Sequence, residues 1–195
     1  MQRYSANVDQ ISQDSHDSDQ RGDHVDIIRR LHGILAPLVN PAEEHLKHAL
    51  KALQIHPCEL DPYVSEPVEL PYGRNVLLRT ADVEVVLIHL PSGAQSLPHD
   101  HGDSYGYEIV VEGELTNLLF ASKADGSLYL AKKEVYPANS LLYMPRHQIH
   151  AINNAAQQRV VTLNVYTPPL SSCRKYTRYA PSQQLLYYRT PLEFL

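Results

Sequence analysis

The stretch GAQSLPHDHGDSYGYEIVVEG, residues 93–113, carries the most informative pattern in this chain of 195 residues. It places His99 and His101 two residues apart and sets glycines at positions 93, 106 and 113 around them. Residues i and i+2 of a strand point to the same face, so both imidazoles are predicted to project into one interior. Two satisfied polar side chains at the rim of a barrel would produce the same pair, so the pair alone does not decide for a metal site.

A second histidine stretch, PRHQIHAINN at residues 145–154, supplies an independent pattern. The two spacings overlay the two motifs of the cupins, in the right order: Gly93-x5-His99-x-His101-x4-Gly106-x6-Gly113 and Pro145-x-His147-x2-His150-x3-Asn154. A glutamate is usual where Gly106 stands, and a glycine where His147 stands. The overlay selects His99, His101 and His150 as metal ligands and leaves His147 in a loop.

The segments around these motifs predict a mainly β fold. From about residue 62, short runs rich in Val, Ile, Leu, Thr and Tyr are separated by Gly, Asn, Asp, Ser and Pro. These runs are VLLRT (76–80), VEVVLIHL (83–90), GYEIVVEGEL (106–115), TNLLFA (116–121), SLYLAKKEVY (127–136), SLLYMP (140–145), HAINN (150–154) and RVVTLNVY (159–166). About eight strands at regular spacing predict a jelly-roll β-barrel, here the cupin type.

Two or three helices are expected before the barrel. Apolar residues recur at helical spacing from Asp26 until Pro37, and Asn40-Pro41 is a typical start for a second helix, PAEEHLKHALKAL. Residues 1–22 are polar and are predicted to be a disordered arm, with a single domain over 23–195 that ends in a mixed tail from about Ser171.

Composition narrows the class of protein. A net charge of −5 and a pI near 6.1 argue against a nucleic-acid partner, and no apolar run is long enough for a membrane span or a secretory signal. Cys58 and Cys173 are the only cysteines, too few for a disulfide framework. We therefore expect a cytoplasmic monomer whose partner is a small molecule.

Gly106 in the place of the usual carboxylate predicts a centre of three neutral imidazoles. The common iron(II) oxygenase site instead has two histidines and one carboxylate. A divalent metal held by neutral ligands keeps its full charge, which favours an anionic ligand such as a thiolate. Glu108 falls two residues past the ligand position, so Glu108 and Tyr107 are expected to flank the site without replacing the carboxylate.

Four segments make the chain resemble the cysteine dioxygenases and, more broadly, the bacterial thiol dioxygenases. These segments are PYGRNVL (71–77), SLPHDHGDSYGYEIVVEGELTNLLF (96–120), IHAINN (149–154) and TLNVYTPPLSSCRKY (162–176). The resemblance implies Fe(II) as the metal, O2 as co-substrate and a small thiol as the substrate that is oxidised to a sulfinate. L-Cysteine, which would give cysteine sulfinate in cysteine catabolism, is the first-choice substrate.

The resemblance also assigns roles to residues outside the histidine motifs. Arg74 matches an arginine that binds the substrate carboxylate, which suits the planar fork of a guanidinium. Tyr72, expected on the same strand face, matches a tyrosine of the same pocket, and Tyr166 matches the catalytic tyrosine. From the residues alone, a surface salt bridge for Arg74 and a barrel-core position for Tyr166 remain alternatives.

Two departures from the family pattern bear on function. Gly106 replaces the cysteine that cross-links to the tyrosine in the mammalian enzymes, so no Cys–Tyr cross-link is expected. Thr162, Asn164 and Tyr166 replace a Ser, His and Tyr relay, and asparagine cannot carry a positive charge. We therefore expect no ionisation of this relay between about pH 6 and 8. Dioxygenation of another thiol such as 3-mercaptopropionate, or a non-catalytic metal-binding cupin sensor, are the alternatives.

Overall fold

Helices open the part of the chain that the computed structural model describes, which is residues 26–177 and the backbone of residues 186–191. They are α1 (Ile27–Leu35), α2 (Glu43–Ala52), the short α3 (Pro57–Leu60) and a 3-10 turn at Asp61–Tyr63. Two or three helices were predicted, and this is confirmed. The predicted arm at residues 1–22 lies outside the described residues.

The predicted start of the second helix is wrong in detail. Helix α2 begins at Glu43 with Ala42 as its cap, and no side chain caps it. Asn40 instead adopts a left-handed backbone conformation with φ 39°, and its backbone N–H donates to Asp82 Oδ1 over 3.2 Å. The asparagine therefore serves the turn between the helices and ties it to the loop before β2.

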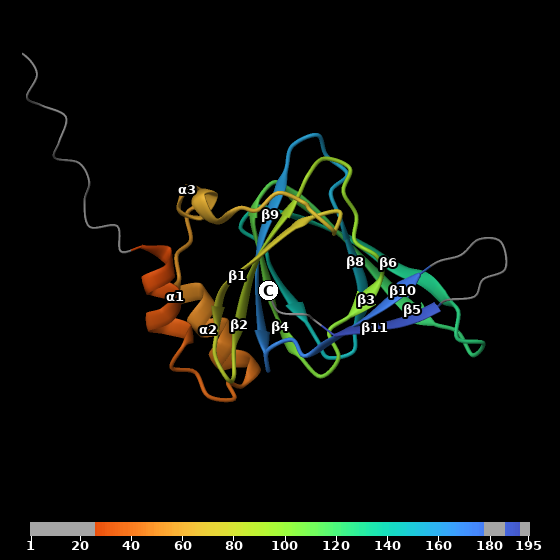
Figure 1. The fold of residues 1–195 in the computed structure, drawn as a ribbon, viewed down its shortest axis with the longest axis horizontal. Helices are drawn as coiled ribbons and strands as arrows, with labels where there is room; N and C mark the ends of the chain where they lie inside the picture. Colours follow the sequence, from red (N-terminus) through yellow and green to blue (C-terminus); the bar gives the residue numbers. More distant parts are fainter. Residues whose placement is uncertain (1–25, 178–185, 192–195) are drawn as a thin grey trace, which may run out of the picture.

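Two antiparallel sheets face each other and form the barrel (Figure 1). The first sheet has the order β1 (Gly73–Arg79), β2 (Glu84–Leu90), β9 (Val160–Thr167), β4 (Tyr105–Glu112) and β7 (Leu141–Met144). The second has the order β11 (Leu186–Pro191), β10 (Ser172–Thr177), β3 (His99–Asp100), β8 (Ile149–Asn153), β5 (Glu114–Ser122) and β6 (Leu128–Pro137). The mainly β jelly-roll barrel predicted from the strand pattern is confirmed.

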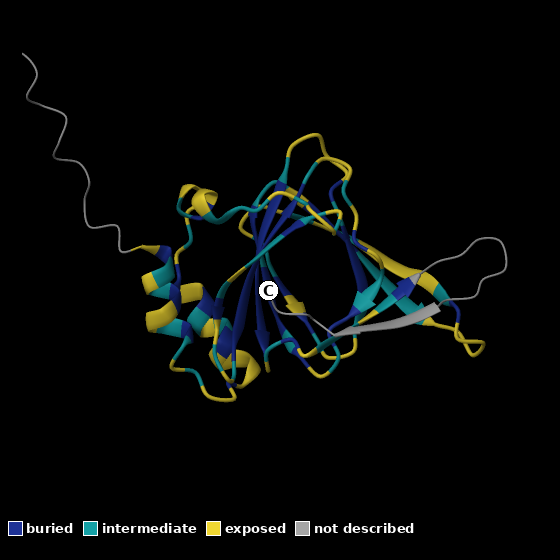
Figure 2. Ribbon diagram, in the orientation of Figure 1, coloured by how far each residue is buried: buried dark blue, intermediate teal, exposed yellow. Residues whose placement is uncertain are grey.

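The first sheet is covered on both faces, which explains its nearly continuous apolar runs. One set of alternate side chains packs with α1 and α2 outside the barrel, among them Val85, Leu87 and Leu163. The intervening set, including Val86 and Ile88, lies in a second cluster inside the barrel. Strands β2 and β9 are consequently buried along their whole length, and Figure 2 shows this sheet as a dark band. The rule of alternation then sends the even-numbered residues of β9 into the barrel.

The run GYEIVVEGEL forms two strands and not one. Gly113 separates β4 from β5 with φ +80°, and a Cβ at this position would lie 2.5 Å from the carbonyl oxygen of Arg159. Only glycine fits this turn without displacing the neighbouring backbone. Strand-like residues continue beyond Glu112 on one side and Glu114 on the other, and they conceal the turn in the sequence.

The segment from Ser171, expected to be a mixed tail, is partly strand. β10 pairs with β3, so that Lys175 lies opposite His99, and β10 also pairs with β11. The charged residues Arg174 and Lys175 weaken the strand pattern in the sequence, and pairing with the histidine strand overrides it.

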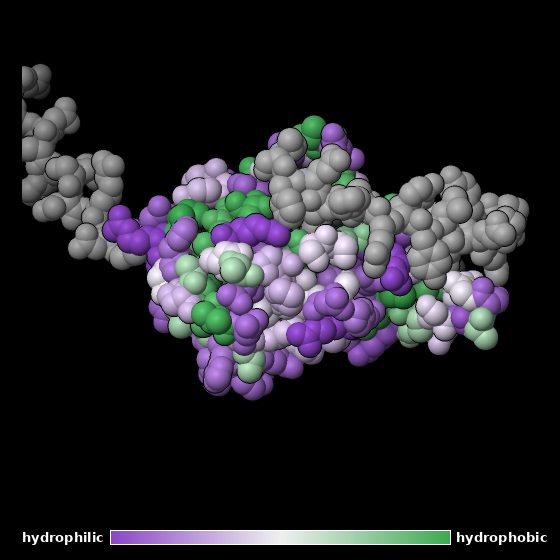
Figure 3. Space-filling view, turned by 60° about the horizontal axis from the view of Figure 1, so that its bottom comes forward, coloured by the Kyte–Doolittle hydropathy of each residue, from purple (hydrophilic) through white to green (hydrophobic). Residues whose placement is uncertain are grey.

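Charged and polar side chains cover most of the face in Figure 3, and hydrophobic ones form small separate patches among the coloured residues. Exposed large apolar residues are likewise scattered over the fold, from Val39 to Tyr143. Among residues 26–177 and 186–191, the structure contains no helix with the length and apolarity that crossing a membrane requires.

Candidate metal centre and its pocket

Three histidines converge inside the barrel from the second sheet. His99 lies on β3, His101 follows that strand directly, and His150 lies on β8 as the cross-strand partner of His99. Their ring centroids are 4.7–5.1 Å apart, and one nitrogen from each ring lies within 4.8 Å of the others. The expectation that the two histidines of the first motif point into one interior is confirmed.

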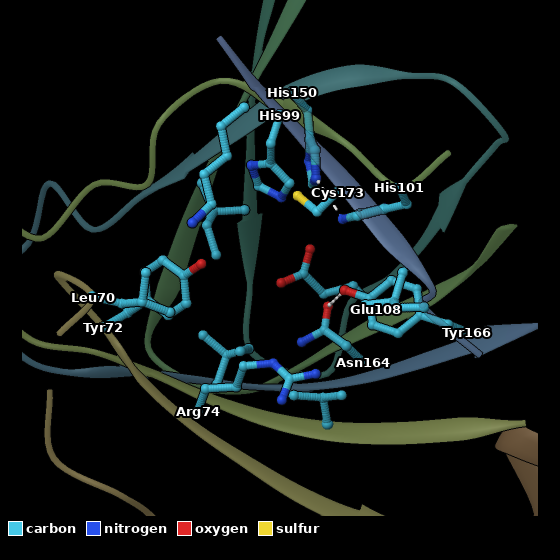
Figure 4. A pocket seen from close by; sticks show the side chains of 15 residues that line it. Leu70, Tyr72, Arg74, His99, His101, Glu108, His150, Asn164, Tyr166 and Cys173 are labelled. Atoms are coloured by element: carbon cyan, nitrogen blue, oxygen red, sulfur yellow. Dashed lines mark hydrogen bonds between the residues drawn. The ribbon is translucent and has the colours of Figure 1, made fainter. Parts of the chain in front are cut away.

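Hydrogen bonds orient two of these rings. His99 Nδ1 lies 2.9 Å from the carbonyl oxygen of Leu97, and His150 Nδ1 lies 3.0 Å from Asn117 Oδ1. Both partners are acceptors, so each Nδ1 carries the proton and each Nε2 presents a lone pair to the centre. Figure 4 shows the rings pointing toward a common space.

The arrangement fits a divalent metal ion. His101 Nε2 and His150 Nε2 are 3.4 Å apart, close to the separation of about 3 Å that two metal–nitrogen bonds of about 2.1 Å impose. Burial lowers the pKa of all three histidines, and Coulomb repulsion from the charged form of a neighbouring histidine adds to this effect for His101 and His150. Neutral imidazole is the form that binds metal.

His147 lies outside this cluster. It occupies a turn with φ +58°, its side chain is exposed, and its Nε2 is 3.4 Å from Asp103 Oδ1. The register of the second motif therefore brings His150, and not His147, to the other two histidines, as the overlay predicted.

The histidines line a pocket with a volume of about 100 Å³. In Figure 4 the histidines occupy one end and Arg74 the other, with Tyr72 and Tyr166 on opposite sides. Water in bulk occupies about 30 Å³ per molecule, so the pocket suits a ligand of a few heavy atoms. Its apolar wall is formed by Leu70, Val86, Ile88, Ile152 and Leu170.

Arg74 lies at the pocket and is held by a carboxylate that sequence reasoning missed. Its Nη2 donates to Glu84 Oε1 over 2.9 Å, while Arg79 Nη1 donates to Glu84 Oε2 over 2.7 Å. Glu84 is fully buried and also accepts from the backbone N–H of Leu170. Two guanidinium groups share one carboxylate, so the cluster keeps an excess positive charge. A charge inside the apolar run VEVVLIHL was the available signal.

Tyr72 lines the pocket but lies immediately before β1, so its predicted place on the strand is wrong by one residue. Burial raises its pKa to about 12. The pocket position itself agrees with the expectation, although Tyr72 lies in the bend that precedes the strand. Tyr72 is therefore protonated at neutral pH and presents a neutral hydroxyl.

The relay residues form a chain of hydrogen bonds. The Tyr166 hydroxyl donates to Asn164 Oδ1 over 3.3 Å, and Asn164 Nδ2 donates to Thr162 Oγ1 over 2.8 Å. All three are buried on the barrel face of β9, and the Tyr166 ring packs edge-on against His101 with centroids 4.9 Å apart. Burial raises the pKa of Tyr166 well above its ordinary value, so the hydroxyl is protonated.

Tyr107 and Glu108 do not both flank the site. Tyr107 points out of the barrel toward α2, where its hydroxyl lies 3.4 Å from Glu43 Oε1. Glu108 points inward and lines the pocket with 1% of its surface exposed. Adjacent strand residues face opposite sides, so only one of the pair reaches the pocket.

Gly106 is required by the backbone as well as by the site. A Cβ there would lie 1.9 Å from the carbonyl oxygen of Val165, on the neighbouring strand β9. No side chain fits that gap, so β4 and β9 approach each other more closely here than a cysteine would allow.

Two further residues of the site, one behind a histidine and one on the pocket wall, escaped the sequence patterns. Asn117 on β5 holds His150 in place, and nothing in TNLLFA distinguishes it from a residue exposed on a strand. Cys173 on β10 lines the pocket, and burial raises its pKa to about 11. Its thiol is therefore neutral near pH 7.

Comparison with known proteins gives the same family as the site residues. A family model described as Cysteine dioxygenase type I matches residues 15–179. Cysteine dioxygenase type 1 from Bos taurus and that from Rattus norvegicus are each 24% identical over 156 residues, which cover 77% of this chain and 77% of each relative.

A solved structure supports the fold alone. An uncharacterized conserved protein with a double-stranded beta-helix domain from Klebsiella pneumoniae has a TM-score of 0.50 and 21% identity. The match covers 60% of this chain and 87% of that one.

Proposed function

Because the chain belongs to the cysteine dioxygenase type I family, we propose that it is an iron(II)-dependent dioxygenase of a small thiol, with L-cysteine as the first-choice substrate. The observation that carries the proposal is the convergence of His99, His101 and His150 at one end of a small pocket whose other end holds Arg74. The overall reaction is RSH + O2 → RSO2H, which balances without any further reductant.

His99, His101 and His150 would hold the iron through their Nε2 atoms. Bound iron(II) supplies the redox chemistry toward O2 and lowers the pKa of a thiol that coordinates to it. The hydrogen bonds from His99 to Leu97 and from His150 to Asn117 hold these two rings in the orientation that points Nε2 toward the metal position. The protein's own contribution at this end is a rigid set of neutral donors.

Arg74 would bind the carboxylate of the substrate at the far end of the pocket. Glu84 engages only one of the nitrogens of Arg74, and a guanidinium has five N–H donors, so donors remain for a second carboxylate. Arg79 supports this role, because it shares Glu84 and leaves excess positive charge beside the pocket. Fixing the carboxylate orients the thiol toward the metal end, a proximity effect.

Tyr166 would contact the reacting atoms, since its ring packs against His101 and its hydroxyl lies among the pocket residues. Apolar residues such as Val86 and Ile88 exclude water from the remaining wall. Tyr72, whose hydroxyl is neutral, would complete the carboxylate end beside Arg74.

The test is oxygen uptake by the iron-loaded protein with L-cysteine, cysteamine and 3-mercaptopropionate. Fastest uptake with L-cysteine supports the proposal, and fastest uptake with 3-mercaptopropionate keeps the chemistry and changes the thiol. Stoichiometric iron with no uptake on any thiol contradicts the proposal and favours a metal-binding sensor. His150→Ala should lose both iron and uptake. His147→Ala is the control and should keep both, because His147 belongs to the same motif but its side chain is exposed.

A further inference from the structure

Glu108 is a buried carboxyl group in the pocket for which the proposed function has no role. Its cross-strand partner is Asn164, so it lies on the same barrel face as the relay of Thr162, Asn164 and Tyr166. Glu108 Oε1 has no hydrogen-bond partner among the described residues. Leaving a buried oxygen unpaired is unfavourable, because the group has lost its hydrogen bonds to water. In Figure 4 the carboxyl lies beside the Tyr166 hydroxyl and the Asn164 amide.

The relay is a directed chain that leads to this carboxyl. Tyr166 donates to Asn164, and Asn164 donates to Thr162, whose oxygen is thereby an acceptor. The Thr162 proton must then point elsewhere, and Thr162 hydrogen-bonds to Glu108 from its diagonal position on the adjacent strand. An ionised carboxylate only accepts hydrogen bonds, so it fixes this direction. In this direction the Tyr166 hydroxyl donates to Asn164 and not into the pocket.

When Glu108 is protonated, the hydrogen bonds of the relay can all run in the opposite direction, and each relay group still has a partner. The acid donates to Thr162, the Thr162 hydroxyl donates to Asn164 Oδ1, and the amide turns so that its nitrogen donates to Tyr166. The Tyr166 hydroxyl is then free to donate into the pocket. Asparagine serves in both directions because it carries one acceptor and one donor group.

We propose that Glu108 is a positioning residue whose charge sets the direction of the hydrogen bonds through Thr162 and Asn164, and thereby whether Tyr166 donates into the pocket. This inference rests on the proposed function, because it takes the pocket as the place where thiol and O2 meet. A hydroxyl that donates into the pocket stabilises negative charge developing on oxygen, whereas one committed to Asn164 does not.

The surroundings of Glu108 place its protonation near neutral pH. Burial raises its pKa to about 7, and the hydrogen bond from Thr162 partly opposes this. Its β7 partner Leu142 is apolar. The titratable and charged groups around it are Tyr166 on β9, Tyr136 on β6, Arg74 on β1 and, elsewhere on the pocket wall, Tyr72, Cys173, Lys175 and the three histidines. The group that titrates therefore lies on β4, one strand away from Asn164. The expectation of a relay without ionisation took account of the β9 residues alone.

The experiment is 13C NMR of the full chain loaded with zinc, which is diamagnetic, with labels at tyrosine Cζ and glutamate Cδ. The Tyr166 signal is identified by its loss in Tyr166→Phe and the Glu108 signal by its loss in Glu108→Gln. Between about pH 5 and 9, both signals should shift with one common midpoint. In Glu108→Gln the Tyr166 shift should vanish, because glutamine does not titrate.

Thr162→Val separates coupling from general disturbance, because it removes the connecting hydroxyl while keeping the size of the side chain. Glu108 should still titrate in this variant, and the Tyr166 signal should no longer follow it. Glu112→Gln is the matched control, since Glu112 lies on the same strand and pairs with Arg159 at the surface. A Tyr166 signal that is independent of pH in the wild type, or one that still follows pH in Glu108→Gln, overturns the proposal.

Kinetics provide a second measurement. The kcat of the iron-loaded wild type should fall about tenfold as pH rises through the titration midpoint of Glu108. A tenfold change corresponds to the loss of about one hydrogen bond. Glu108→Gln should lose this fall, and Glu112→Gln should keep it. Absence of thiol oxidation would contradict the proposed function only, because the zinc-loaded NMR titration does not depend on turnover.

Discussion

Asn117 accepts a hydrogen bond from His150 across the β5–β8 pair, with Oδ1 and Nδ1 3.0 Å apart. The bond fixes which ring nitrogen carries the proton and leaves the other for the metal. The partner of His99 is a backbone carbonyl, which no substitution removes. Asn117 is therefore the side chain through which the orientation of the metal centre can be tested without removing a ligand.

Asn117→Ala should lower iron affinity ten- to a hundredfold while the fold persists, as expected when a partner behind a metal ligand is lost. The measurement is a competition titration with a chelator. Asn153→Ala is the control, because Asn153 also lies in this region of the sheet but its amide donates to Gln95. Equal affinities for the wild type and Asn117→Ala would remove Asn117 from any role at the metal.

Arg74→Ala should raise the KM for L-cysteine about ten- to a hundredfold, because the variant loses a charge-assisted hydrogen bond to the substrate carboxylate. The KM for cysteamine, which has no carboxylate, should change far less. Arg79→Ala is the control for an indirect effect through Glu84, since Arg79 binds the same carboxylate. It should leave the KM for L-cysteine nearly unchanged if Arg74 itself binds the substrate. Parallel losses on both thiols in Arg74→Ala would mean that Arg74 holds Glu84 and does not bind substrate.

Gly106→Cys should destabilise the protein by about 1–3 kcal/mol or more and should not form a cross-link to Tyr166. The added Cβ would meet the backbone of Val165 at 1.9 Å, which a side-chain rotation cannot relieve. Thermal unfolding and intact mass measure the two effects. Gly33→Ala on α1, where nothing lies within 4 Å of the new Cβ, should be neutral or stabilising. A well-folded Gly106→Cys variant that loses two hydrogens would contradict this account of the β4–β9 approach.

The raised pKa of Glu108 predicts how stability depends on pH. Its pKa is about 7 in the folded protein and near 4.5 when unfolded, so its contribution is fully present below about pH 4.5 and is lost as pH rises through 7. Relative to Glu108→Gln, the metal-free wild type should therefore lose on the order of 3 kcal/mol of unfolding free energy over this interval. Denaturant unfolding at several pH values measures it.

Glu59 provides a control of opposite sign for the same titration. Its pKa is lowered to about 2, chiefly by the hydrogen bond from Arg30, so its contribution is present above about pH 4.5 and is lost as pH falls. Glu59→Gln should change stability above that pH with little change between pH 5 and 8. A stability difference between wild type and Glu108→Gln that does not vary with pH would contradict the burial argument for Glu108.

Spacing and alternation predict the barrel and the convergence of the three histidines, because both are local rules. The i, i+2 pair places His99 and His101 together, and the register of the second motif distinguishes His150 from His147. The boundary at Gly113 and the strand at 172–177 do not follow from local pattern, because an approach of two backbones and a long-range strand pairing decide them.

Charged residues in apolar runs mark what the motifs overlook. Glu84 and Glu108 each interrupt a hydrophobic stretch, and both are buried. Glu108 lines the pocket, and Glu84 binds Arg74, which lines it. Their partners, Arg79 for one and Thr162 for the other, depend on register between strands, which a single sequence does not contain. The anchoring of Arg74 and the carboxyl beside the relay therefore become visible only in the folded barrel.

Oxygen labelling distinguishes dioxygenation of a thiol at this centre from every other outcome. Iron-loaded protein is incubated with L-cysteine under 18O2, and the mass of the product is measured, with His150→Ala as the inactive control. We expect a sulfinate that carries two labelled oxygen atoms and is formed by the wild type alone. Disulfide or unlabelled product from the wild type, or equal yields from both proteins, would contradict it.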